Sequence, residues 1–143
     1  MLRNQQREQL RNIGLLILRI GLGMMFIIHG YPKIFGGPEK WAEVGAAMQY
    51  LGIDFAPMFF GFIAGATEFF GGLFLMLGLF FTPSLILLLM VMLVATIKHI
   101  GAGDPAAFYS HSIEMAIVFF SLLFIGTGKY NIDKKIQKKR RRY

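Results

Sequence analysis

The chain of 143 residues is apolar and basic: 55% of its residues are hydrophobic, 16% are charged, the mean hydropathy is +0.56 and the net charge is +7. In soluble domains about a quarter of the residues are charged. This composition therefore excludes an ordinary soluble protein and predicts one membrane domain over residues 1–143. The chain has no cysteine, which excludes disulfides, thiol redox pairs, iron–sulfur clusters and thiolate metal sites.

The excess of basic charge lies at the two ends of the sequence. Residues 129–143 carry a net charge of +7 and residues 1–11 one of +2, whereas residues 12–128 carry −2. Basic segments beside long apolar runs are typical of the cytoplasmic side of a membrane protein. We therefore expect a basic cytoplasmic tail over 129–143. Nucleic-acid binding is not expected, because no basic face carries interleaved aromatic residues.

Four apolar segments are long enough to cross a bilayer, whose core of about 30 Å needs roughly 20 helical residues. They cover residues 13–35, 56–80, 83–100 and 105–126. Thr82-Pro83 and Asp104-Pro105 each combine an N-cap residue with proline at the first helical position, which predicts where the third and fourth spans start. Arg19 interrupts the first run and no cleavage site follows, so we expect a retained span rather than a signal peptide.

Between the first two spans, residues 38–51 form a shorter amphipathic segment in which Trp41, Val44, Met48 and Leu51 recur at helical spacing. A segment of this length cannot cross a membrane, so we expect a helix lying at the interface. The sequence thus predicts an all-α membrane protein. It would be a four-transmembrane-helix bundle with a short interfacial amphipathic helix between spans one and two, and with both termini cytoplasmic.

Every predicted span carries ionisable side chains, and such groups at membrane depth face the bundle interior because they are costly in lipid. Glu68 lies midway along the second span, and the long side chain of Arg19 can extend toward it. We predict that these two residues pair and form the floor of a polar pocket that opens outward. The pocket candidates are Arg19, His29, Lys33, Glu68, Lys98, His99, His111 and Glu114. The helix-packing candidates are Gly61, Gly65, Gly71 and Gly72.

Other interpretations of these groups stay open. Lys33 and Lys98 lie near helix ends, where their charges can extend to the interface, and a buried Arg–Glu pair can simply hold a bundle together. Histidine and glutamate in an aromatic pocket suit a quinone head group and proton transfer. Haem is not expected, because His29 lies about two turns deeper than His99 or His111. No metal site is expected, since no close His spacing occurs.

Three motifs carry a family resemblance. Leu18-Arg19-Ile20-Gly21 precedes the run from His29-Gly30 through Lys33 to Gly36-Gly37, and Glu68-Phe69-Phe70-Gly71-Gly72 precedes Leu77-Gly78-Leu79-Phe80-Phe81-Thr82. These motifs resemble the patterns LR, HG-x-x-K-[LI]-F-G-G and E-x-x-G-G…G-L-x-T of the DoxX family. Residues 126–133 are similar to its ending G-P-G-R-x-S-L-D and depart from it at Thr127, Lys129, Asn131 and Ile132. The resemblance covers residues 15–133.

The resemblance implies a multi-pass protein of the bacterial or archaeal cytoplasmic (inner) membrane. Members include the small subunit of a thiosulfate:quinone oxidoreductase, proteins described as quinol oxidases, and membrane partners of soluble redox enzymes. The leading hypothesis is therefore the membrane subunit of an oxidoreductase complex, with a quinone or small amphiphile in the pocket, a redox partner and no covalent cofactor. The alternative is a non-enzymatic membrane scaffold or small-solute carrier. The sequence leaves the oligomeric state open, and a homo-oligomer is one alternative.

Overall fold

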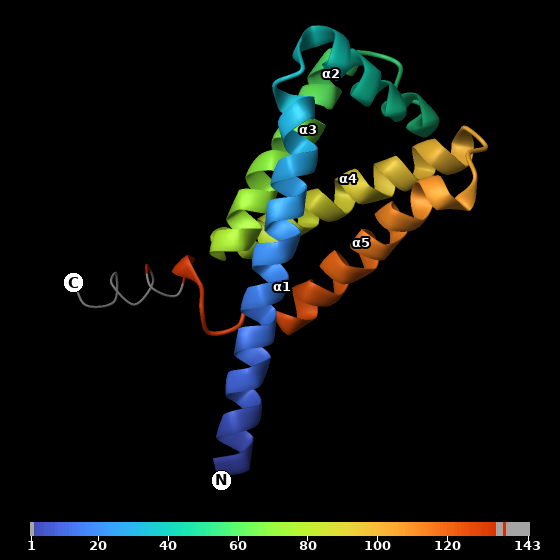
Figure 1. Cartoon of the computed structure of the whole chain (residues 1–143). Coiled ribbons are helices and arrows are strands. Elements are labelled where there is room, and N and C mark those ends of the chain that lie inside the picture. The colour runs from blue at the N-terminus through green and yellow to red at the C-terminus, as the bar shows by residue number, and fades with distance from the viewer. Residues whose placement is uncertain (1, 134–135, 137–143) are drawn as a thin grey trace.

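The computed structural model describes residues 2–133 and residue 136, and this part of the chain contains helices and no strand (Figure 1). The elements are α1 (Leu2–Ile34), α2 (Gly37–Gly45), the 3₁₀-helix η1 (Ala46–Leu51), α3 (Pro57–Leu77), α4 (Phe81–Gly101) and α5 (Ala106–Ile125). The helices α1, α3, α4 and α5 are each long and apolar enough to cross a membrane. The predicted fold class is confirmed.

The first helix is longer than the predicted span. It begins at Leu2, because residues 2–12 include good helix formers such as Arg, Gln and Glu and contain no glycine or proline. The predicted basic tail over 129–143 falls mostly outside the described residues.

The starts of α4 and α5 differ from the prediction by one or two residues. Phe80 adopts a left-handed conformation with φ 45°, and α4 begins at Phe81, whose side chain is buried in the core. Pro83 therefore lies within the first turn, where a missing N–H leaves no hydrogen bond unmade. The helix α5 begins at Ala106, one residue later than predicted.

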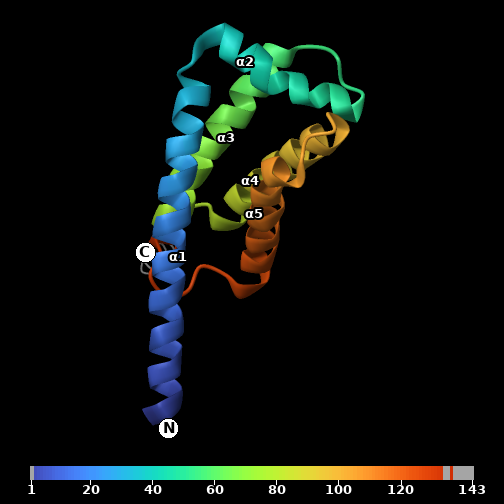
Figure 2. The same cartoon turned by 45° about the vertical axis from the view of Figure 1, so that its right-hand side comes forward.

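The four long helices form two antiparallel pairs (Figures 1 and 2). In both views α1 runs beside α3 and α4 runs beside α5, and the two pairs diverge toward the end that carries α2, η1 and the connection between α4 and α5. We call this end of the bundle the α2 end. The segment η1 bridges the pairs there, with Tyr50 packed against Gly101 of α4.

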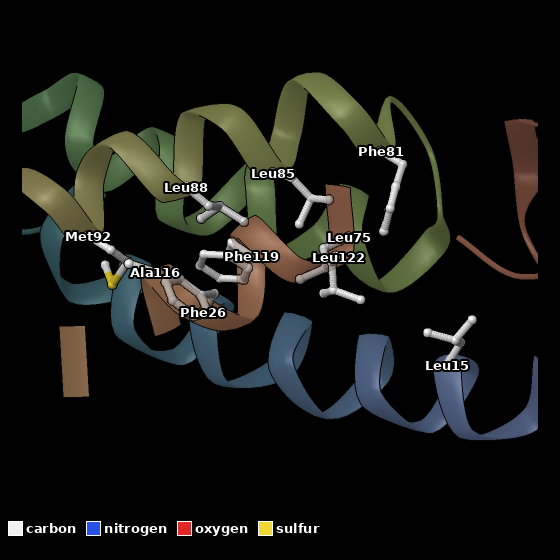
Figure 3. Close-up of a cluster of buried hydrophobic side chains, with 10 residues drawn as sticks. All are labelled: Leu15, Phe26, Leu75, Phe81, Leu85, Leu88, Met92, Ala116, Phe119 and Leu122. Atoms are coloured by element: carbon white, nitrogen blue, oxygen red, sulfur yellow. The ribbon is translucent and has the colours of Figure 1, made fainter. Parts of the chain in front are cut away.

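A cluster of buried apolar side chains joins the two helix pairs where they lie close together (Figure 3). Leu85, Leu88 and Phe119 are fully buried in it. The rings of Phe26 on α1 and Phe119 on α5 lie 5.0 Å apart between centroids, so the cluster holds α1 close to α5 at this level. Phe26 and Met92 belong to this cluster, and both also line the cavity described below.

Glycines bring the backbones of α1 and α3 into direct contact. A Cβ atom at Gly72 would lie 2.7 Å from the carbonyl oxygen of Gly23, and one at Gly30 would overlap the backbone of Phe69. Because no side chain separates the helices at these points, the side chains of α1 and α3 beside them lie at matched depths.

Candidate functional site

A cavity of about 140 Å³ lies between the two helix pairs on the side of the α2 end. All four membrane-spanning helices contribute to its lining, which consists of Phe26, His29, Lys33, Glu68, Met92, Ala95, His99, Phe108, His111 and Ser112. His29 on α1 and both Phe108 and His111 on α5 are exposed, so the cavity opens to the surface between these two helices. Five of the eight pocket candidates named from the sequence therefore lie around one cavity.

An ion pair forms one wall of this cavity. Nζ of Lys33 lies 2.7 Å from Oε1 and 2.6 Å from Oε2 of Glu68. The Glu68 side chain is only 2% exposed, whereas that of Lys33 is 31% exposed. Gly30 and Gly65 position the pair, because each lets the backbones of α1 and α3 approach beside it. The pair with Glu68 can use two N–H groups of the ammonium and does not use the third.

The predicted pairing of Arg19 with Glu68 is wrong, and the distance along α1 gives the reason. Gly30 faces the backbone at Glu68, and Arg19 precedes Gly30 by eleven residues, which is about 16 Å of helix. An arginine side chain does not span that distance. The Arg19 side chain instead lies against Gly78, which follows the C-terminal end of α3.

Arg19 holds the segment 126–133 against the bundle. Its guanidinium is 1% exposed and donates hydrogen bonds to the carbonyl oxygens of Thr127, at 2.9 Å, and of Tyr130. Asn12 lies about two turns before Arg19 on the same face of α1. It accepts a hydrogen bond from the backbone N–H of Lys129 at 2.8 Å. The role of Arg19 in the structure is thus to bind main-chain carbonyls at the end remote from the cavity.

Two histidine contacts border the cavity. Nδ1 of His99 lies 2.7 Å from Oδ2 of Asp104, and since a carboxylate only accepts hydrogen bonds, the ring nitrogen is the donor. This hydrogen bond leaves Nε2 of His99 on the other side of the ring. Asp104 does not cap α5, whose N-cap residue is Pro105. His29 and His111 face each other across the opening, with ring centroids 5.9 Å apart.

Two further candidates lie outside the cavity lining. Lys98 is half-buried and lies near α2, where a hydrogen bond and the charge of Lys40, with a smaller contribution from Lys98, hold the pKa of Glu43 below its ordinary value. Glu114 is exposed on the outer face of α5.

Several lining residues were not predicted from the sequence. Phe26, Met92 and Phe108 supply apolar walls, and Ser112 hydrogen-bonds Thr96 across α4 and α5 at 2.8 Å. Aromatic and hydroxyl residues are common in apolar helices, so only the shared helical face of Phe26, His29 and Lys33 offered a signal. Within the described residues, no group of three or more His, Asp or Glu residues could hold a metal ion.

The fold and the composition define a multi-pass helical membrane protein with a cavity between its four long helices. The model of the DoxX family matches residues 14–101, which include most of α1 and extend to the last residue of α4, and the chain belongs to this family. Comparisons with curated proteins and with solved structures gave no match.

Proposed function

We propose that the cavity binds the ring of a quinone or a similar small amphiphile, and that the protein is the membrane subunit of a redox complex. The observation that carries this proposal is the Lys33–Glu68 pair, whose carboxylate is buried, in the wall of a cavity that is otherwise lined mainly by aromatic, apolar and histidine side chains. A charged pair inside a membrane bundle needs a reason beyond packing, because apolar side chains would fill the same space at lower cost.

The size of the cavity suits one ring. A protein cavity of about 150 Å³ accepts benzene, and the present cavity measures about 140 Å³. It holds a head group and not an isoprenoid tail. The tail would leave through the opening between α1 and α5, which faces the lipid.

The polar groups suit a ring with oxygen atoms. Lys33 can donate its third N–H to a ligand oxygen, and His99, held by Asp104, offers Nε2 for proton transfer. Oxidation of a hydroquinone ring releases two protons and two electrons. The histidines would accept the protons, and a redox partner of this chain would receive the electrons.

Orientation follows from charge. Residues 1–11 and 129–143 are basic, and among the described residues the start of α1 and the segment 126–133 lie at the end remote from the cavity. The positive-inside rule then assigns this end to the cytoplasm, and the α2 end to the outer face of a bacterial or archaeal inner membrane.

The test is a calorimetric titration of the purified protein in nanodiscs with decylubiquinone. Lys33→Met should weaken binding at least about tenfold by removing the donor, whereas the matched control Lys98→Met should bind like the wild type. A wild-type protein that binds no quinone would overturn the proposal and favour the scaffold or solute-carrier alternative.

A further inference from the structure

The outer face of α5 carries an exposed carboxyl group, that of Glu114, within the membrane-spanning helix. Ser112, Ala116, Phe119 and Leu122 of this helix are buried against the bundle. On the opposite side, at spacings of three and four residues, an exposed stripe consists of Ala107, Ser110, Glu114, Ile117 and Ser121. Large apolar side chains such as Phe120 and Phe124 are also exposed on α5, as Phe62 and Leu93 are on α3 and α4, but the described exposed positions of α3 and α4 include no carboxyl group.

Glu114 is exposed on a membrane-spanning helix, where a carboxyl group is unfavourable. It lies eight residues after Ala106, which is about 12 Å from the start of a helix of about 30 Å, so its short side chain reaches neither surface of the membrane. It forms no hydrogen bond or ion pair with any of the residues that the structure describes. A carboxyl group facing hydrocarbon is strongly unfavourable, and it therefore needs a polar partner from outside this chain.

We propose that a second copy of this chain covers this face, with α5 packed against α5 about a two-fold axis along the membrane normal. The argument is complementarity within the face itself. His111 is exposed one turn before Glu114, and the two side chains of one chain form no hydrogen bond with each other. A two-fold axis between parallel helices can set Glu114 of each copy beside His111 of the other, so the dimer would contain this carboxyl–imidazole contact twice.

Three of the five stripe residues, Ala107, Ser110 and Ser121, are small, whereas Ile117 is large and 61% exposed. Helices in membranes associate through small positions together with interhelical hydrogen bonds. The dimer itself does not depend on the proposed function, since its contacts involve α5 and not the ligand.

The absence of cysteine from the sequence allows a clean test in native membranes. Ser110→Cys and Ser121→Cys place a single thiol on the stripe, and Leu93→Cys and Phe62→Cys place one on the exposed faces of α4 and α3. Oxidation should convert the stripe variants to disulfide-linked dimers of twice the chain mass of 16.1 kDa, and leave the two controls monomeric. Two residues that face each other across a two-fold axis satisfy the distance that a disulfide requires.

A second pair of variants tests the role of the carboxyl group. Glu114→Gln keeps a donor and an acceptor and should keep the dimer, whereas Glu114→Leu should lower the cross-linked fraction of Ser121→Cys roughly tenfold. Equal cross-linking at the controls, monomers throughout, or an adduct with a different protein would each overturn the proposal. Native mass spectrometry of the wild type tests for the dimer without a substitution. Quinone titration of the same sample tests the cavity separately.

Discussion

Lys33 and Glu68 lie on different helices and meet at 2.6 Å inside the membrane-spanning bundle, with the carboxylate almost fully buried. One ammonium group contacts both carboxylate oxygens, so the pair neutralises itself and keeps one N–H for the cavity. The close approach of α1 and α3 at Gly30 and Gly65 places both side chains at the same depth.

Removal of one member of this pair should destabilise the protein more than removal of both. Glu68→Met leaves a cation without its partner; such a change costs about 3–5 kcal/mol for a fully buried pair and about half of that here, because Lys33 is partly exposed. The double variant Lys33→Met, Glu68→Met should recover most of the loss. Thermal unfolding of the four proteins in one detergent measures this cycle, and additive effects would contradict the pairing.

Two neighbouring glycines of α1 should respond in opposite ways to alanine. A Cβ atom at Gly23 would lie 2.5 Å from the carbonyl oxygen of Gly72, so Gly23→Ala should separate α1 from α3 and lower the melting temperature. Gly21 has no atom within 4 Å of an added Cβ, and Gly21→Ala should stabilise the helix by about 0.5–1 kcal/mol. Equal effects of the two substitutions would show that α1 does not pack on α3 through Gly23.

Arg19→Gln should release the segment 126–133. The buried guanidinium binds two carbonyl groups of this segment, and a glutamine is too short to reach both. Trypsin cleavage after Lys129 should therefore become about tenfold faster, the equivalent of one lost hydrogen bond to a charged group. Arg11→Gln, an exposed change on the same helix, is the control, and unchanged cleavage in Arg19→Gln would contradict the docking.

Asp104→Asn tests whether Asp104 orients His99. An asparagine side chain can donate as well as accept, so His99 loses the preference for a proton on Nδ1. We expect decylubiquinone affinity to fall about fivefold to tenfold, while Asp54→Asn, an exposed change in the connection before α3, leaves it unchanged. Equal affinities for the two variants would remove His99 from the proposed binding groups.

Apolar runs and breakers were enough to predict the four spans and a helical segment between the first two, although the single helix predicted over 38–51 is α2 followed by the 3₁₀-helix η1. Run length and helix geometry determine these features, and both can be read locally. The starts of α4 and α5 were less predictable, because they depend on where Phe81 is buried and on what Asp104 contacts.

The pairing inside the bundle was not predictable in the same way. The sequence showed that Arg19, Lys33 and Glu68 lie within membrane spans, but not the relative sliding of α1 and α3. That register depends on which glycines meet, such as Gly23 with Gly72. A slide of about 21 Å, the rise of the fourteen residues from Arg19 to Lys33, would be needed to exchange Lys33 for Arg19 as the partner of Glu68.

Photoaffinity labelling with an azido-quinone in nanodiscs, followed by peptide mapping, tests the central claim most directly. The account predicts saturable labels within residues 26–33, 92–99 and 108–112, which decylubiquinone displaces and Lys33→Met reduces while Lys98→Met does not. Labels confined to the exposed faces of α3 or α4, without displacement by decylubiquinone, would contradict a quinone site in this cavity.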